Sequence, residues 1–205
     1  SNAYGGGIAS SEGANFDGIS LTNVDIFNNS ARAYGGGLRI GDRASLKNVL
    51  VYNNTANEGG GIYLANDASF ENVRVASNTA NELGGGMVIM ASPSGLSINS
   101  LSILDNTAPQ GGGILIRQNV ELSKINISNN NGGGIYITYP GGSSDKQYQS
   151  KISYSNIFNN GTGVYHAYPS AQIAGANNYW GDSSGPYHPS QNTSGKGDSV
   201  NAFVN

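Results

Sequence analysis

The sequence predicts an all-β solenoid, a parallel β-helix in which short strands from successive coils stack on one another. Three observations support this fold class. A glycine triplet followed by an aliphatic residue recurs along the 205 residues, a second motif ending in Asn recurs in step with it, and the intervening segments alternate apolar and variable positions. Self-similarity with a period of about 20 to 50 residues is typical of solenoids.

The glycine motif marks one position in every predicted coil. Gly is a poor strand former, so its repetition indicates a tight corner in which a Cβ would not fit. The aliphatic residue that follows should begin a strand and point into the core. The six copies are Gly5–Ile8, Gly35–Leu38, Gly59–Ile62, Gly84–Met87, Gly111–Ile114 and Gly132–Ile135, with a weaker seventh copy at Gly161–Val164.

The asparagine motif consists of an aliphatic residue, two variable residues and Asn, and its copies lie 24 to 30 residues apart. Asn tolerates the left-handed backbone of a corner, and its amide can bond to the next Asn in a ladder between coils. We therefore interpret these residues as structural rather than as ligands. They are Asn29, Asn54, Asn78, Asn106, Asn130 and Asn160.

The segments between the two motifs have the pattern of strands. Residues 61–64 alternate apolar and variable positions, and residues 70–75 continue in the same way after a polar turn. No segment has the apolar spacing and the caps of a helix. Each coil should therefore contain three short strands, with equivalent residues of neighbouring coils roughly 4.8 Å apart.

The repeat divides the chain into three parts. Residues 1–3 resemble a scar left by tag removal, residues 4–175 contain the repeats, and residues 176–205 form a closing segment with the only Trp, Trp180. A solenoid needs an atypical end that covers its last coil. We expect the chain to be trimmed from a longer protein.

Composition excludes several classes of function. A net charge of -3 with 10 Lys and Arg residues provides no basic face for a phosphate backbone, so we expect no nucleic-acid partner. No segment approaches the roughly 18 apolar residues of a membrane span. The chain has no cysteine, which excludes disulfides and thiolate metal sites.

The two motifs together resemble the repeats of polymorphic outer membrane proteins and of related right-handed parallel β-helix proteins in the pectate-lyase-like superfamily. The segment Asn178–Gly181, with Gly185, Pro186 and His188, is similar to the stretch that closes such helices in many surface proteins. The resemblance implies a right-handed β-helix of about seven or eight coils of three short strands. It also implies a secreted or cell-surface location and further domains in the same chain.

The strand after each glycine triplet has an outward face that could bind a ligand. Enzymes similar to this superfamily place acidic groups there, but this chain has aromatic, aliphatic and Arg side chains instead. Such groups suit sugar rings, so we expect a glycan site. Alternatively, a loop at residues 139–150, another protomer or another domain covers the strip. The candidate binding residues are Arg39, Tyr63, Arg117, Tyr136 and Tyr165.

Two carboxylate pairs are candidates for a metal site and for catalysis. Glu58 and Glu82 each follow a ladder Asn by four residues, so they should stack on neighbouring coils. Solvation or a bound calcium ion would relieve their repulsion, and no other cofactor is expected. Glu12 and Asp42 occupy matching turns and are the candidate pair for glycoside hydrolysis.

The function that fits best is an exported cell-surface module that binds a polysaccharide or another surface protein without catalysis. The alternatives are a polysaccharide lyase or glycoside hydrolase, and a structural stalk of a larger surface protein. An enzyme needs convergent carboxylates in a cleft, whereas a binding module needs an open aromatic strip. His166 falls at an inward position and His188 in the closing segment, which favours core and cap roles over a metal site.

Overall fold

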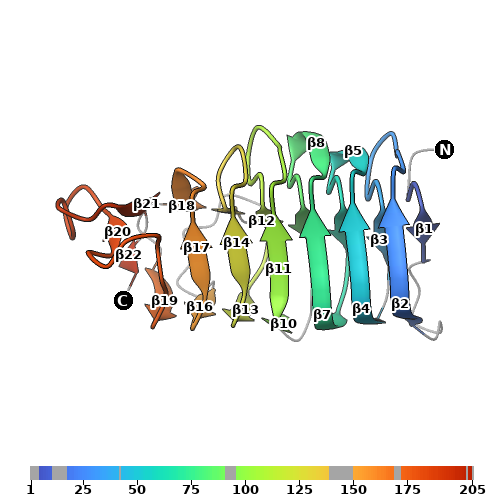
Figure 1. The fold of residues 1–205 in the computed structure, drawn as a ribbon, viewed down its shortest axis with the longest axis horizontal. Coiled ribbons are helices and arrows are strands. Elements are labelled where there is room, and N and C mark those ends of the chain that lie inside the picture. The colour runs from blue at the N-terminus through green and yellow to red at the C-terminus, as the bar shows by residue number, and fades with distance from the viewer. Residues whose placement is uncertain are drawn as a thin grey trace.

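The computed structural model of the chain describes residues 5–10, 18–41, 43–90, 96–138, 150–168, 172–201 and 203–204. Glu12, Asp42, the predicted scar at residues 1–3 and residues 139–149 of the predicted loop lie outside these ranges. Strands of successive coils stack side by side along the long axis of the molecule (Figure 1). The predicted all-β parallel solenoid is therefore confirmed.

The largest sheet follows the glycine triplets, and we name it the glycine sheet. Its strands pair in parallel, so that Ile62 lies opposite Leu38 on one side and Met87 on the other. The predicted inward columns are thus formed. In spatial order the nine strands are β1 (Ile8–Ala9), β3 (Leu38–Ile40), β6 (Ile62–Leu64), β9 (Met87–Ile89), β12 (Ile114–Ile116), β15 (Ile135–Ile137), β18 (Thr162–His166), β21 (Gly197–Val200) and β20 (Pro186–Tyr187).

Two further sheets complete the wall of the solenoid. The six-stranded sheet contains β2 (Ile19–Phe27), β4 (Ala44–Tyr52), β7 (Ala68–Ala76), β11 (Leu101–Leu104), β14 (Asn126–Ser128) and β17 (Asn156–Phe158). The five-stranded sheet contains β10 (Leu96–Asn99), β13 (Val120–Ser123), β16 (Lys151–Ser153), β19 (Gln172–Ala176) and β22 (Phe203–Val204). In each coil the chain changes direction at a corner residue that has a positive φ. These corner residues are Asn23, Asn48, Asn72, Ser100, Lys124, Tyr154 and Asn177.

The number of coils is slightly lower than the sequence suggests. The six-stranded sheet takes one strand from each coil, so the described chain makes five to six complete turns rather than seven or eight. The remaining length belongs to the closing segment. There β21 and β20 extend the glycine sheet and β22 extends the five-stranded sheet.

The glycine corners are tight for two physical reasons. Gly59 has a φ of 63°, which lies in the left-handed region that side chains disfavour. A Cβ on Gly60 would lie 2.4 Å from the carbonyl oxygen of Thr79 in the next coil. Glycine is therefore required where the backbones of neighbouring coils approach most closely.

The interior combines aliphatic columns with the asparagine ladder. Each buried aliphatic side chain contributes about 1.5 to 3 kcal/mol to stability. Asn54, Asn78 and Asn106 are fully buried, and the backbone N and Nδ2 of each donate to Oδ1 of the next ladder Asn at 2.9 to 3.0 Å. The predicted ladder is confirmed. Its last member, Asn160, donates instead to Oδ2 of Asp198 at 2.9 Å.

The end of the solenoid is covered by the closing segment. Trp180 is only 5% exposed and packs beside Gly163, where a Cβ would lie 3.1 Å from the indole ring. Within this segment the backbone N of Asp198 donates to the carbonyl of Trp180, and β21 is held against the last coil by its parallel pairing with β18. The described residues include no helix of the length and apolarity that a membrane crossing requires.

Candidate binding surface

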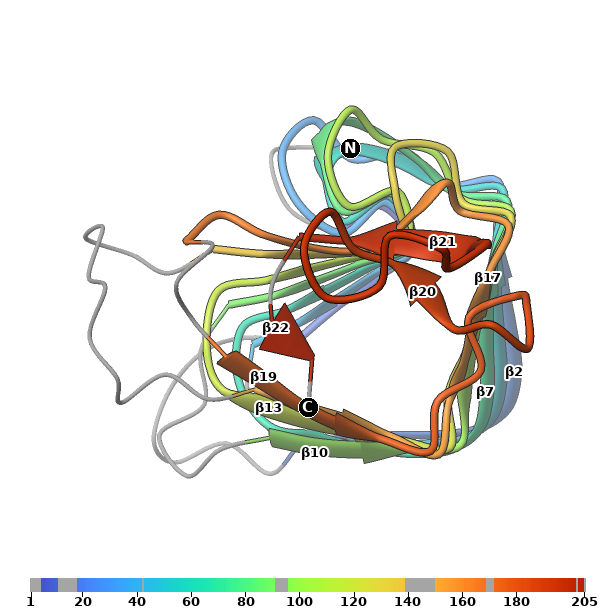
Figure 2. The same cartoon turned by 90° about the vertical axis from the view of Figure 1, so that its left-hand side faces the viewer.

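An additional layer lies over the outward face of the glycine sheet in the first four coils. We name it the lobe and define it as residues 30–34, 55–58, 79–83 and 107–110. Its members bridge from coil to coil, and two of them form the paired strands β5 (Thr55–Glu58) and β8 (Thr79–Leu83). In Figure 2 these loops arch above the glycine sheet at the top of the view. The lobe therefore shields what the sequence suggests is an exposed strip.

The centre of the predicted strip is buried beneath the lobe. Tyr63 is 7% exposed, and Val88 and Leu115 are completely buried. Tyr34 and Leu83 of the lobe pack against this second hydrophobic cluster, and the rings of Tyr34 and Tyr63 lie 4.6 Å apart. The strip is consequently not one continuous open groove, and the expectation of such a groove is wrong for its central part.

The two arginine side chains around Tyr63, Arg117 and Arg39, contact other groups of the protein. Arg117 Nη1 lies 3.5 Å from Glu58 Oε2 and 3.3 Å from Met90 Sδ. Arg39 reaches the carbonyl of Ser10 with Nη1 at 3.4 Å.

The environment of Tyr63 argues against a catalytic role for its phenol. Burial raises the pKa of Tyr63 to about 12, and the negative charge of Glu58 adds to the effect. The phenol is therefore protonated at neutral pH and is unsuited to act as a general base.

The predicted stacking of Glu58 on Glu82 is wrong. Glu58 lies opposite Leu83, because β8 contains one more residue than β5 and the register shifts between the two strands. Glu82 is displaced to an exposed position, while Glu58 faces Arg117. Within the described ranges no group of three or more His, Asp and Glu side chains could hold a metal ion. The register removes the geometric basis for a calcium site between these two residues.

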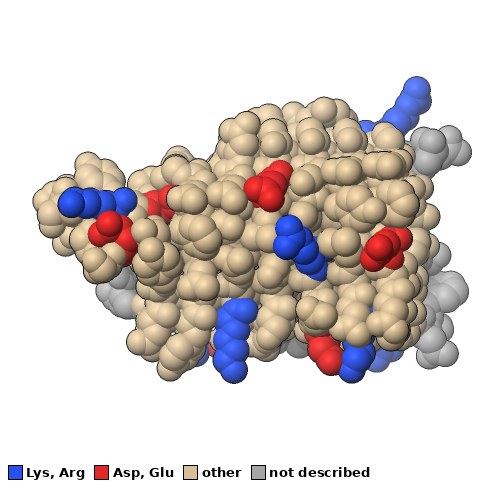
Figure 3. All heavy atoms as spheres, in the orientation of Figure 1, with Lys and Arg blue, Asp and Glu red and all other residues tan. Residues whose placement is uncertain are grey.

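The lobe stops before the last coils, and the outward face is open there. Four or five residues separate the ladder Asn from the glycine triplet in the first four coils, but only Asn131 does so after Asn130 and none after Asn160. The space-filling view shows the upper outline of the molecule stepping down toward the C-terminal end (Figure 3). Loop length alone thus determines which part of the sheet is covered.

Two tyrosines form the surface of this open end. Tyr136 of β15 and Tyr165 of β18 lie directly opposite each other, with stacked rings 5.2 Å apart at an angle of 14°. Tyr165 is 42% exposed and Tyr136 is half-buried. Burial, followed by the neighbouring Tyr165 and Tyr168, raises the pKa of Tyr136. We name the stacked pair the aromatic ledge.

The last part of the lobe borders the aromatic ledge. Pro109 and Gln110 are exposed, and a Cβ on the adjacent Gly111 would lie 3.1 Å from Cβ of Tyr136. The ledge therefore lies at the foot of a step. Of the five predicted binding residues, Tyr136 and Tyr165 are brought together here, whereas Arg39, Tyr63 and Arg117 belong to the covered region.

The two histidines lie in structural positions. His166 is 1% exposed, its Nδ1 accepts a bond from the backbone N of Tyr168, and burial lowers its pKa. His188 is 6% exposed, and its Nδ1 accepts bonds from the backbone N atoms of Ser190 and Gln191. Each ring thus organises a local turn.

Comparison with protein families agrees with this geometry. Residues 40–185 match the family model described as a right-handed β-helix region. The chain belongs to this family. No curated protein and no solved structure matches it. Membership of the right-handed β-helix family gives the hand of the coils, while the function has to be inferred from the surface.

Proposed function

We propose that this right-handed β-helix is an exported, non-catalytic cell-surface module that binds a glycan on the aromatic ledge. The single observation on which the proposal rests is the stacked pair of half-buried Tyr136 and exposed Tyr165 at the point where the lobe ends. The facing surfaces of the two rings pack on each other, so a sugar would place its apolar face on an outer face of the stack, and the tyrosine hydroxyls can bond to its rim. The rigid sheet holds both rings in place without further ordering cost.

Export to the cell surface rests on the resemblance to polymorphic outer membrane proteins and pectate-lyase-like proteins. The absence of cysteine is compatible with it. Binding without catalysis is favoured because, among the residues that the structure describes, Pro109, Gln110 and tyrosines border the ledge rather than a pair of carboxylates. Another surface protein is the alternative partner for the same ledge.

A glycan array with a matched pair of variants tests the proposal. Tyr165 and Tyr187 are 42% and 43% exposed, and Tyr187 lies outside the stacked pair, in β20, two strands beyond β18 in the glycine sheet. We expect the wild-type protein and Tyr187→Ala to bind the same glycans, and Tyr165→Ala to lose at least about tenfold in affinity, as expected for one stacking contact. Uniform silence across plant, algal and bacterial glycans would exclude glycan binding.

The same experiment separates binding from catalysis. Glycans that bind are incubated with the protein, and the products are analysed by chromatography and by the ultraviolet absorbance of unsaturated sugars. We expect the glycans to remain intact. A shortened product would support a glycoside hydrolase, and an unsaturated product would support a polysaccharide lyase.

A further inference from the structure

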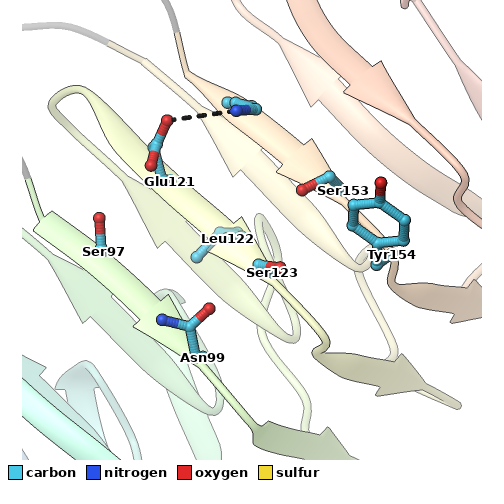
Figure 4. Close-up of a pocket in the computed structure, with 8 residues that line it drawn as sticks. Ser97, Asn99, Glu121, Leu122, Ser123, Ser153 and Tyr154 are labelled. Carbon is cyan, nitrogen blue, oxygen red and sulfur yellow. Dashed lines mark ion pairs between the residues drawn. The ribbon is translucent and has the colours of Figure 1, made fainter.

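A hollow lies on a different face of the solenoid from the aromatic ledge. It has a volume of about 290 Å³ and lies on the outward side of the five-stranded sheet, across β10, β13 and β16 (Figure 4). Because three neighbouring strands span about 10 Å, the hollow matches the width of a sugar ring with its substituents. We name it the corner groove. Its lining residues are Ser97, Asn99, Glu121, Leu122, Ser123, Lys151, Ser153 and Tyr154.

Tyr154 lines the corner groove and has a backbone conformation that the needs of the fold do not explain. It occupies the corner between β16 and β17 with a φ of 52°, a left-handed conformation that is costly for a bulky side chain. Asn, which tolerates this conformation, occupies four of the seven equivalent corners, Ser100 and Lys124 occupy two, and Tyr154 is the aromatic residue among them.

The side chain of Tyr154 is also largely exposed to solvent. The residue is 63% exposed, the largest value among the exposed large apolar side chains of the described chain. The corner residues opposite it in the two neighbouring coils are Lys124 and Asn177, so the Tyr154 ring has no aromatic partner at this corner. A strained backbone that presents an unpacked aromatic ring is typical of binding sites.

The other lining groups complement a hydroxyl-rich ligand. Ser97, Ser123 and Ser153 provide small hydroxyls that donate and accept on the floor of the groove, and Asn99 adds an amide at its edge. Glu121 Oε1 and Lys151 Nζ lie 3.6 Å apart, so an acceptor and a donor stand side by side. Neighbouring hydroxyls of one sugar can bond to such a pair together. Because the two charges balance, the groove has no net preference for an ionised ligand.

We propose that the corner groove is a second binding site, for a neutral hexose unit whose apolar face stacks on Tyr154. The ring hydroxyls bond to the three serines, Asn99 and the Glu121–Lys151 pair. This site lies on a different sheet from the aromatic ledge and does not depend on ligand binding there. Together, the two sites would allow one module to hold two glycan segments, which increases avidity on a polysaccharide surface.

The test is a nuclear magnetic resonance titration of the protein with oligosaccharides of known structure. Maltohexaose, cellohexaose and laminarihexaose are the neutral probes, and hexagalacturonate is the acidic comparator. We expect at least one neutral probe to shift the resonances of Ser123, Ser153 and Tyr154. If no neutral probe shifts them at millimolar concentration, or if hexagalacturonate binds more tightly at low salt, the proposal of a neutral hexose site is wrong.

The decisive variant is Tyr154→Asn, because Asn suits the left-handed corner. We expect at least about a tenfold loss of affinity, as for one aromatic contact, together with a Tm equal to or above that of the wild type. Unchanged affinity would contradict the proposal. A lower Tm would contradict the argument that Tyr154 is retained for binding at the cost of strain.

Ser123→Val provides a second test that does not alter the corner. Val is a good strand former and fills the floor of the groove, so binding should be lost while the fold persists. Retained affinity would also overturn the proposal. Tyr165→Ala serves as the matched control, since it should leave the Tyr154 resonance shifts intact. Shifts at Tyr154 that disappear with Tyr165→Ala would assign the binding to the aromatic ledge alone.

Discussion

The covered and open halves of the glycine sheet have the same backbone but different surfaces. In both halves an aliphatic residue follows the glycine triplet and points inward, and the next residue points outward. In the covered half that outward residue, such as Tyr63 or Leu115, is part of a second hydrophobic cluster. In the open half Tyr165 is exposed. A repeat can therefore conserve its core while the length of one connection decides whether its outer face packs or binds.

The largest expected difference between the halves is in the cost of removing a tyrosine ring. Tyr63→Ala should destabilise the fold by about 4 kcal/mol, because it empties a buried site beneath the lobe. Tyr165→Ala should cost no more than about 0.5 kcal/mol, as is typical of exposed positions. Urea unfolding of both variants measures the difference. Equal costs would show that the two halves are not covered differently.

We expect substitutions in the asparagine ladder to cost the same stability in the covered half and in the open half. Asn78 lies beneath the covered part and Asn130 beneath the open part, and each accepts two bonds from the preceding ladder Asn. Replacing either by Ala leaves these buried donors without an acceptor and should cost about 3 kcal/mol. Unfolding midpoints compare the two variants. A much smaller cost at Asn130 would mean that the open half is also looser inside.

The burial of Tyr63 also predicts a dependence of stability on alkaline pH. Its pKa is raised from 10.0 to about 12 in the folded protein, chiefly by burial. Between these values the unfolded chain releases the Tyr63 proton while the folded chain retains it, so stability falls as the pH rises. Below pH 10 the contribution is fully present. Unfolding measured across this range should show a shallower decline for Tyr63→Phe than for the wild type, and an identical decline would place Tyr63 in solvent.

The smallest expected effect concerns the ion pair that joins Glu58 of the lobe to Arg117, which follows β12. The side chains of Glu58 and Arg117 are 14% and 24% exposed, so Glu58→Gln should cost about 1 kcal/mol. Glu71 is the matched control, because its pair with Lys47 is far more exposed and Glu71→Gln should cost close to nothing. Thermal unfolding at low and high salt compares them. A larger effect at Glu71 would contradict the burial of the Glu58 pair.

Much of the fold could be predicted because its causes are local and repeated. The glycine triplets, the alternation after them and the ladder residues each leave a pattern in the sequence, and the inward columns follow from register. The outward direction of Tyr136 and Tyr165 follows in the same way. The number of coils could not be counted from the motifs, since the closing segment replaces the last coils without repeating their motif.

The surface could be predicted only in part, because cover depends on segments that vary between coils. The lobe was detectable in principle, since the distance from the ladder Asn to the glycine triplet falls sharply after Asn106. The displacement of Glu82 depends on a single additional residue in β8, which shifts the register by one position. Tyr154 leaves no pattern at all, because its importance depends on a backbone angle at a corner whose residue type changes between coils.

Tyrosine-specific chemical labelling, mapped by mass spectrometry with and without the glycan selected on the array, tests the central claim most directly. The covered and open halves predict that Tyr63 remains unmodified, that Tyr165 is modified, and that the bound glycan protects Tyr165. Modification of Tyr63 at the rate of Tyr165, or a bound glycan that leaves Tyr165 fully reactive, would contradict the account.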